Sequence, residues 1–182
     1  SLKTTTFNSA NELVTVFSQR IADILRQAIS EKGKASLVVS GGSTPLPLFK
    51  ALSERAVDWS KVTITLADER WVDSTDAASN EKMVRQNLLQ YKAAVANFIP
   101  LKTEHANAED AVEPLTATFK KVGLPFDVVI LGMGEDGHTA SLFPCSPQIE
   151  VGIDVNLPAM LIATQPTTAP HQHMSFLLNP SA

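Results

Sequence analysis

Short apolar runs alternate with longer segments of helical periodicity along this chain of 182 residues. Residues 36–40, 62–67 and 126–131 read SLVVS, VTITLA and FDVVIL. Runs of this length that are rich in β-branched residues are typical of buried strands. Strands that alternate with helices form βαβ units, so the pattern predicts an α/β fold with a mostly parallel sheet.

The first helix has a recognisable start and end. Ser9 and Glu12 have the spacing of a capping box, and apolar residues at helical spacing follow. Gly33 can end this helix, because glycine readily adopts the left-handed conformation of a C-terminal cap. Pro45 suits the first position of a second helix, where no intrahelical N–H is needed.

Weaker signals predict further elements. Residues 79–90 and 107–121 are expected to be helices, although Pro114 falls inside the second of them. Residues 159–164 and 174–178 are candidates for two more strands. The length and the lack of repeats or linkers favour a single domain over residues 1–182.

Composition narrows the possible partners. The net charge of −4 and pI near 5.5 argue against nucleic acid, whose phosphates need a basic face. No apolar run approaches the ~18 residues of a membrane span, and no secretory signal is evident. The single cysteine, Cys145, excludes an internal disulfide. We therefore expect a cytoplasmic protein that binds neither nucleic acid nor membrane and is a monomer or a weak homo-oligomer.

Polar loops follow the three predicted strands. In parallel sheets, ligands bind beyond the carboxyl ends of the strands. The first loop contains Gly41, Gly42, Ser43 and Thr44 ahead of a helix, an arrangement that offers backbone N–H groups to an anion such as a phosphate ester. The alternative is a tight turn with a capped helix.

The second loop begins with Asp68, Glu69 and Arg70. Two carboxylates and a guanidinium at a strand end can hold sugar hydroxyls and an oxyanion. The alternative is a solvated charge cluster, because surface ion pairs are common and contribute little.

The third loop, residues 132–144, reads GMGEDGHTASLFP. Glycines such as Gly134 allow close approach of the backbone to a ligand. Asp136 and His138 are two residues apart, so the acid can orient an imidazole that takes a proton from water. The alternative is a capping turn in which His138 satisfies backbone groups. His171 and His173 do not form a zinc pattern, because no third ligand lies nearby in the sequence.

Together the segments SGGSTP, LADERWV with SNEKMVRQNLL, and FDVVILGMGEDGHTASLFP resemble the 6-phosphogluconolactonases. The resemblance covers roughly residues 36–170. It implies a Rossmann-like, mostly parallel sheet with helices on both faces. It also implies a carboxylic ester hydrolase of the pentose phosphate pathway that converts 6-phospho-D-glucono-1,5-lactone to 6-phospho-D-gluconate, with no cofactor or metal.

The resemblance also assigns roles to residues of the three loops. His138 would be the general base, Asp136 would orient it, and Arg70 would stabilise the oxyanion. The substrate-binding candidates are Gly41, Gly42, Ser43, Thr44, Asp68, Glu69, Asn80, Gly134 and His173.

The related glucosamine-6-phosphate deaminase/isomerases belong to the same superfamily, and two departures separate this chain from them. Their second loop resembles Asp-Glu-Tyr, whereas Arg70 holds the third position here. They carry a Glu where this chain has Phe143. A deaminase/isomerase and a non-catalytic phosphosugar-binding module remain the alternative functions.

A further departure concerns phosphate. Lactonases commonly carry an Arg where this chain has His173, and all 15 Lys and Arg residues lie between Lys3 and Lys121. Family members also continue beyond the point at which this sequence ends. We therefore expect a C-terminal part to be missing here, and phosphate to be held weakly, mainly by the backbone of residues 42–44.

Overall fold

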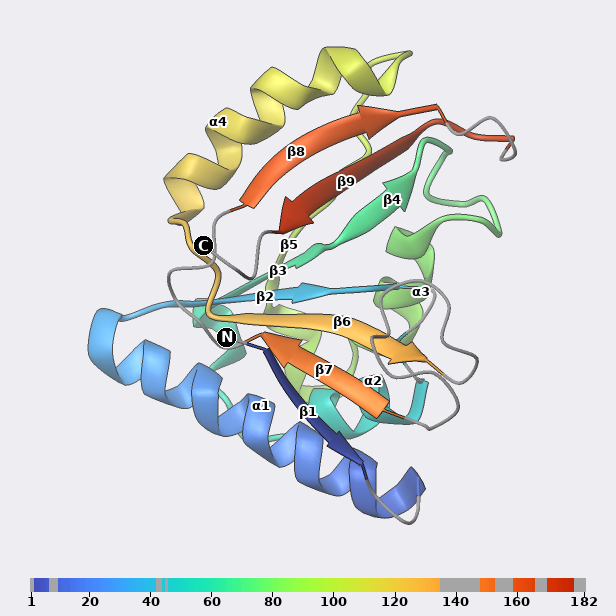
Figure 1. The fold of residues 1–182 in the computed structure, drawn as a ribbon. Coiled ribbons are helices and arrows are strands. Elements are labelled where there is room, and N and C mark those ends of the chain that lie inside the picture. Colours follow the sequence, from blue (N-terminus) through green and yellow to red (C-terminus); the bar gives the residue numbers. More distant parts are fainter. Residues whose placement is uncertain are drawn as a thin grey trace.

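The computed structural model describes residues 2–6, 10–41, 44, 46–134, 148–152, 159–165 and 170–178. Its larger sheet has six strands in the order β1-β7-β6-β2-β3-β5 (Figure 1). Strands β6, β2, β3 and β5 run parallel, and β7 and β1 pair antiparallel at one end. The bounds are β1 Leu2–Thr6, β2 Ala35–Val39, β3 Val62–Leu66, β5 Asn97–Ile99, β6 Val128–Gly134 and β7 Gln148–Gly152. The prediction of a mostly parallel α/β sheet is therefore confirmed.

A second sheet has three antiparallel strands in the order β4-β9-β8. These are β4 Asp68–Arg70, β8 Ala159–Thr164 and β9 His173–Leu178. The segments 159–164 and 174–178 are strands, as predicted. They belong to this small antiparallel sheet and not to the larger, mostly parallel one. The connection between them, residues 165–172, is too short for the crossover of about a dozen residues that parallel strands need.

Four α-helices and three 3₁₀ helices occur among the described residues. They are α1 Ala10–Lys32, α2 Leu46–Ser53, α3 Asn80–Asn87, α4 Val112–Val122, η1 Trp59–Lys61, η2 Tyr91–Val95 and η3 Ala108–Ala111. Gly33 ends α1 at φ +79°, as predicted, and its N–H donates to the Ile29 carbonyl at 2.8 Å. Pro114 does not break α4, because it lies in the first turn, where backbone N–H groups have no intrahelical acceptor. No helix in the described part of the chain is long and apolar enough to cross a bilayer.

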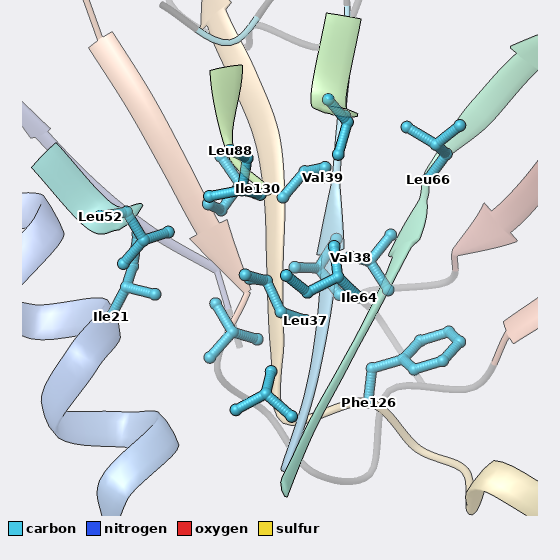
Figure 2. Packing of buried hydrophobic residues seen from close by; sticks show 14 of the residues in the cluster. Ile21, Leu37, Val38, Val39, Leu52, Ile64, Leu66, Leu88, Phe126 and Ile130 are labelled. Carbon is cyan, nitrogen blue, oxygen red and sulfur yellow. The ribbon is translucent and has the colours of Figure 1, made fainter. Parts of the chain in front are cut away.

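The core lies on both sides of the parallel strands. In Figure 2, Ile21 of α1 and Leu52 of α2 lie on one side of β6, β2 and β3, and Phe126 lies on the other. Phe126 contacts Phe176 of β9 edge-on at 5.2 Å between ring centroids, and Phe176 contacts Phe119 of α4 at 4.9 Å. Helices α1 and α2 therefore cover one side, and α4 with the small sheet covers the other.

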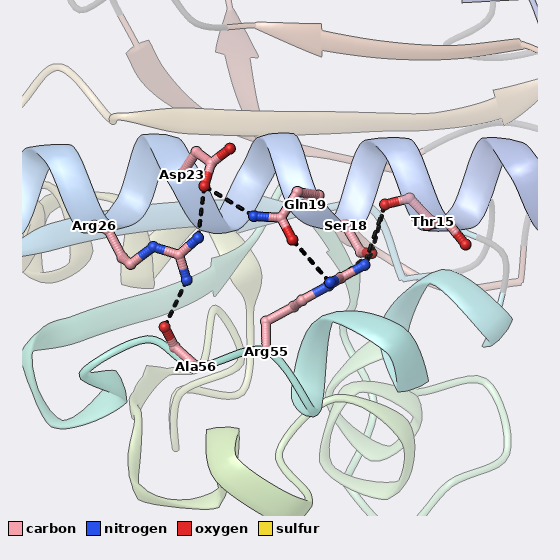
Figure 3. Close-up of polar contacts among 7 residues, drawn as sticks. All are labelled: Thr15, Ser18, Gln19, Asp23, Arg26, Arg55 and Ala56. Atoms are coloured by element: carbon pink, nitrogen blue, oxygen red, sulfur yellow. Dashed lines mark hydrogen bonds and ion pairs between the residues drawn. The ribbon is translucent and has the colours of Figure 1, made fainter.

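Arg55, just after α2, fixes that helix against α1 (Figure 3). Its guanidinium donates to Ser18 Oγ and Gln19 Oε1, each at 2.8 Å, and to the Thr15 carbonyl at 3.2 Å. A planar guanidinium suits such a site because its donors have a fixed geometry. Since α2 follows the first predicted loop, this contact also fixes the frame on which that loop is built.

Candidate active site

The carboxyl ends of β2, β3 and β6 lie along one edge of the larger sheet. Val39 of β2 is aligned with Leu66 on one side and with Ile130 on the other. Just beyond, the Ser40 N–H donates to the Ile130 carbonyl at 3.1 Å and the Ala67 N–H to the Val39 carbonyl at 2.8 Å. The loops that follow β2 and β3 therefore begin side by side, next to the last part of β6, as expected for parallel strands.

The first loop is partly described, through Gly41 and Thr44. Thr44 is buried, and its hydroxyl donates to the Ser40 carbonyl at 2.5 Å, which closes the loop on itself. That hydroxyl proton is thus engaged within the protein, and the oxygen of Thr44 retains accepting capacity. Gly42 and Ser43, which we predicted to hold phosphate, lie outside the described residues.

Gly41 lies directly against Asn80, the first residue of α3. A Cβ at position 41 would be 2.6 Å from Asn80 Cβ and 2.7 Å from Asn80 Cγ, closer than real atoms approach. Glycine is needed here for space, since a larger residue would displace α3 or the loop. The structure thus brings together the first loop and Asn80, two parts of the predicted site.

The three residues of β4 divide between its two faces, because side chains alternate along a strand. Glu69 points inward and is 1% exposed, whereas Asp68 and Arg70 are only partly buried. Both carboxylate oxygens of Glu69 accept backbone N–H groups, from Arg70 at 2.9 Å, Asn80 at 2.8 Å and Glu81 at 2.8 Å. The Glu69 side chain is thus used within the protein, which favours a structural role over the predicted contact with substrate.

Arg70 is anchored at one end of its guanidinium. Its Nη1 donates to the Ala78 carbonyl at 3.1 Å and lies 3.4 Å from Asn80 Oδ1. Within the described part of the chain, no partner engages its Nε or Nη2. Arg70 also lines a surface pocket of about 270 Å³ together with Asn80 and Lys82. A partly free guanidinium beside a pocket is suited to binding an oxyanion or a phosphate.

Asn80 connects β4 to α3. Its Nδ2 donates to the Asp68 carbonyl oxygen at 3.1 Å, and its backbone N–H is held by Glu69. Ser79 caps the helix, because its hydroxyl accepts the Lys82 N–H at 3.1 Å. The predicted helix at 79–90 is thus confirmed in its start and ends a little earlier, at Asn87.

Asp68 shares one strand face with Arg70, and His173 of β9 is aligned with Arg70 across the antiparallel pair. Burial raises the pKa of the Asp68 carboxyl, and the positive charges of Arg70 and His173 lower it in part. Burial likewise raises the pKa of Glu69, and its three backbone N–H donors oppose this. The Asp68 carboxylate has no hydrogen-bond or ion-pair partner among the residues that the structure describes, whereas its backbone carbonyl accepts the Asn80 side chain.

Only the first three residues of the third loop, 132–134, are among those that the structure describes. Gly134 is the last residue of β6, aligned with Gln148 of β7. His138 and Asp136, the predicted base and its orienting acid, lie outside the described residues. Among the residues that are described, no group of three His, Cys, Asp or Glu could hold a metal ion.

Reasoning from the sequence missed two features of the site. One is the position of β9, which places His173 beside Arg70 although the two are far apart in the chain. The other is the inward direction of Glu69. Alternation along a strand would have revealed the second, since Asp68 and Arg70 must face away from Glu69 if the three residues are extended.

An α/β fold with an arginine, an acid and an amide at the carboxyl edge of its parallel strands is typical of proteins that bind a small ligand at that edge. Residues 8–179 match the family described as glucosamine-6-phosphate isomerases/6-phosphogluconolactonase. The chain belongs to this family.

Individual relatives agree with this assignment. The 6-phosphogluconolactonase of Pseudomonas aeruginosa is 43% identical over 169 residues, which is 93% of this chain and 71% of the relative. That of Neisseria meningitidis serogroup A is 44% identical over 177 residues, 95% of this chain and 75% of the relative. The crystal structure of a 6-phosphogluconolactonase from Shewanella baltica superposes with a TM-score of 0.77 at 44% identity, over 93% of this chain and 72% of that one. A monomeric glucosamine-6-phosphate deaminase shares the fold, at 15% identity and a TM-score of 0.66.

Proposed function

We propose that this chain hydrolyses 6-phospho-D-glucono-1,5-lactone to 6-phospho-D-gluconate in the oxidative pentose phosphate pathway. The observation that carries the proposal is the convergence of Arg70, Asp68, Asn80 and Gly41 at one edge of the sheet. It is supported by 43–44% identity to proteins named 6-phosphogluconolactonase. The deaminase/isomerases have a Tyr at the position of Arg70 in their second loop. The Arg in this chain therefore favours the hydrolase over a deaminase/isomerase.

In the proposed reaction, His138 takes a proton from a water molecule as the water oxygen bonds to the lactone carbonyl carbon. Asp136 orients the imidazole. General-base assistance of this kind contributes about 10²–10⁴-fold in rate. The bond from that carbon to the ring oxygen then breaks, and the proton is delivered to the ring oxygen, which becomes a hydroxyl group.

Arg70 is the proposed oxyanion stabiliser, together with loop N–H groups that include that of Gly134. Loss of one such donor costs roughly 3 kcal/mol in transition-state stabilisation. Asp68 and Asn80 would hold sugar hydroxyls. Gly41, Gly42, Ser43 and Thr44 would hold the phosphate, and His173 would assist when protonated. No metal or cofactor enters this proposal.

Paired assays on one preparation test the function. The chain is expected to hydrolyse the phosphorylated lactone above the spontaneous background and to release no ammonia from glucosamine 6-phosphate. Ammonia release without lactone hydrolysis would assign the chain to the deaminase/isomerases. Binding of 6-phosphogluconate with neither activity would indicate a non-catalytic module.

A further inference from the structure

The carboxylate of Glu69 occupies the amino-terminal end of α3. Its Oε1 accepts the N–H groups of Arg70 and Asn80, and its Oε2 accepts that of Glu81. The first N–H groups of a helix have no partner inside the helix and carry partial positive charge, so an anion is stabilised there. In this protein the anion is supplied by its own chain, from the inner face of β4.

One oxygen of Glu69 therefore holds two elements together. Arg70 belongs to β4 and Asn80 to α3, and their backbone N–H groups converge on the same Oε1. From this point the Asn80 side chain reaches the Asp68 carbonyl and lies next to Arg70 Nη1. Gly41 of the first loop packs against the same Asn80.

We propose that Glu69 is a positioning residue, whose buried carboxylate sets Asn80 and Arg70 in the geometry that catalysis requires without itself touching substrate. This inference rests on the proposed lactone hydrolysis. A carboxylate is required because all of its donors are N–H or O–H groups, and an ionised carboxylate accepts at both oxygens. An amide accepts at only one atom, so Glu69→Gln would set an NH₂ group against either the Glu81 N–H or the N–H pair of Arg70 and Asn80.

A matched control exists at the opposite edge of the sheet. Asp127 is also a buried carboxylate, 4% exposed, and accepts the Ser36 N–H at 2.8 Å. It lies just before β6, at the amino ends of the parallel strands and away from the three loops. Asp127 also forms an ion pair with Lys32, whereas no described residue forms one with Glu69. Asp127→Asn therefore removes a buried carboxylate charge, at a greater expected cost in stability, without disturbing Arg70 or Asn80.

Both variants are compared with the unsubstituted chain in steady-state lactone hydrolysis, after thermal melting has verified that each is folded at the assay temperature. We expect Glu69→Gln to lower kcat by roughly tenfold or more, because small misplacements of catalytic groups are costly. KM is expected to change less, and Asp127→Asn to leave kcat within about twofold, as for a change far from the chemistry. A folded Glu69→Gln variant with normal kcat, or equal losses of kcat in both variants, would overturn the proposal.

A second measurement needs no substrate and separates this inference from the proposed function. In ¹⁵N-labelled protein, the side-chain NMR signals of Asn80 Nδ2 and Arg70 Nε should move in Glu69→Gln and stay in place in Asp127→Asn. If the unsubstituted chain proves inactive toward the lactone, the proposed function fails, and these signals alone decide the role of Glu69. Unmoved signals in Glu69→Gln would show that Glu69 only stabilises the fold.

Discussion

Asp68 is a charged residue of the candidate site whose carboxylate has no hydrogen-bond or ion-pair partner among the residues that the structure describes. Burial raises the pKa of its carboxyl despite Arg70 and His173 nearby. A raised pKa in the folded state means that this state holds the proton more tightly than the unfolded chain does. The ionised carboxylate therefore lowers stability at neutral pH, which fits a group kept for ligand binding.

Replacement of Asp68 by Asn should consequently raise the melting temperature at pH 7. Below the ordinary carboxyl pKa of 3.8, Asp68 is protonated in both states, so the gain should disappear there. The same substitution should lower kcat/KM by about tenfold or more, since a hydrogen bond to a charged group contributes about 1.5–3 kcal/mol. Melting curves at several pH values check the first effect, and a lower melting temperature than that of the unsubstituted chain at pH 7 would contradict it.

His138 is the residue on which the proposed chemistry depends most. His138→Ala should lower kcat for lactone hydrolysis by about two orders of magnitude or more, with a modest change in KM, because a general base is lost. Initial rates corrected for spontaneous hydrolysis measure this. His105→Ala, in an exposed loop, serves as the control. Near-normal kcat in His138→Ala would remove this imidazole from the mechanism.

At the scale of elements, the site depends on how closely α3 approaches the first loop. Gly41→Ala would place a methyl group 2.6 Å from Asn80 Cβ. We expect kcat/KM to fall by roughly tenfold or more, because Asn80 and the loop are pushed apart. Gly33→Ala is the control. An alanine at φ +79° lowers stability by about 1 kcal/mol, but this position lies far from the loops, so kcat/KM should be unchanged. Full activity of Gly41→Ala would show that the two elements can separate without harm.

The elements also show which parts of the structure can be read from the sequence. Helix caps and β-branched runs act locally, so the parallel strands β2, β3 and β6 and the four α-helices were predicted, whereas the three-residue parallel strand β5 was not. The pairing of β4 with β9 joins residues about a hundred positions apart, and β4 has three residues, too few for a periodic pattern. The small sheet was therefore missed, and with it the alignment of Arg70 with His173. The roles assigned to His138 and Asp136 stay predictions.

At the scale of the whole molecule, three aromatic rings join the two sheets and α4. Phe119 is 1% exposed and contacts both Phe126 and Phe176 edge-on. Phe119→Ala should lower the free energy of unfolding by about 3–5 kcal/mol, as for other buried Phe residues. Denaturant titration measures this, with Val95→Ala as an exposed control expected to change it by less than about 0.5 kcal/mol. A loss as small as that of the control would mean that the rings are not part of the core.

Ala67 is the single residue between β3 and β4, and it belongs to both sheets through its backbone. Its N–H donates to Val39 of β2, and its carbonyl accepts the N–H of Phe176 in β9, each at 2.8 Å. At the junction of β3 and β4, which the structure describes in full, no linker therefore separates the two sheets, so the small sheet cannot be exchanged there for the corresponding part of a distant relative. Recombination between family members should yield folded chimeras only where a crossover keeps β3, β4 and β9 from the same parent, so these three strands are expected to be inherited as one block.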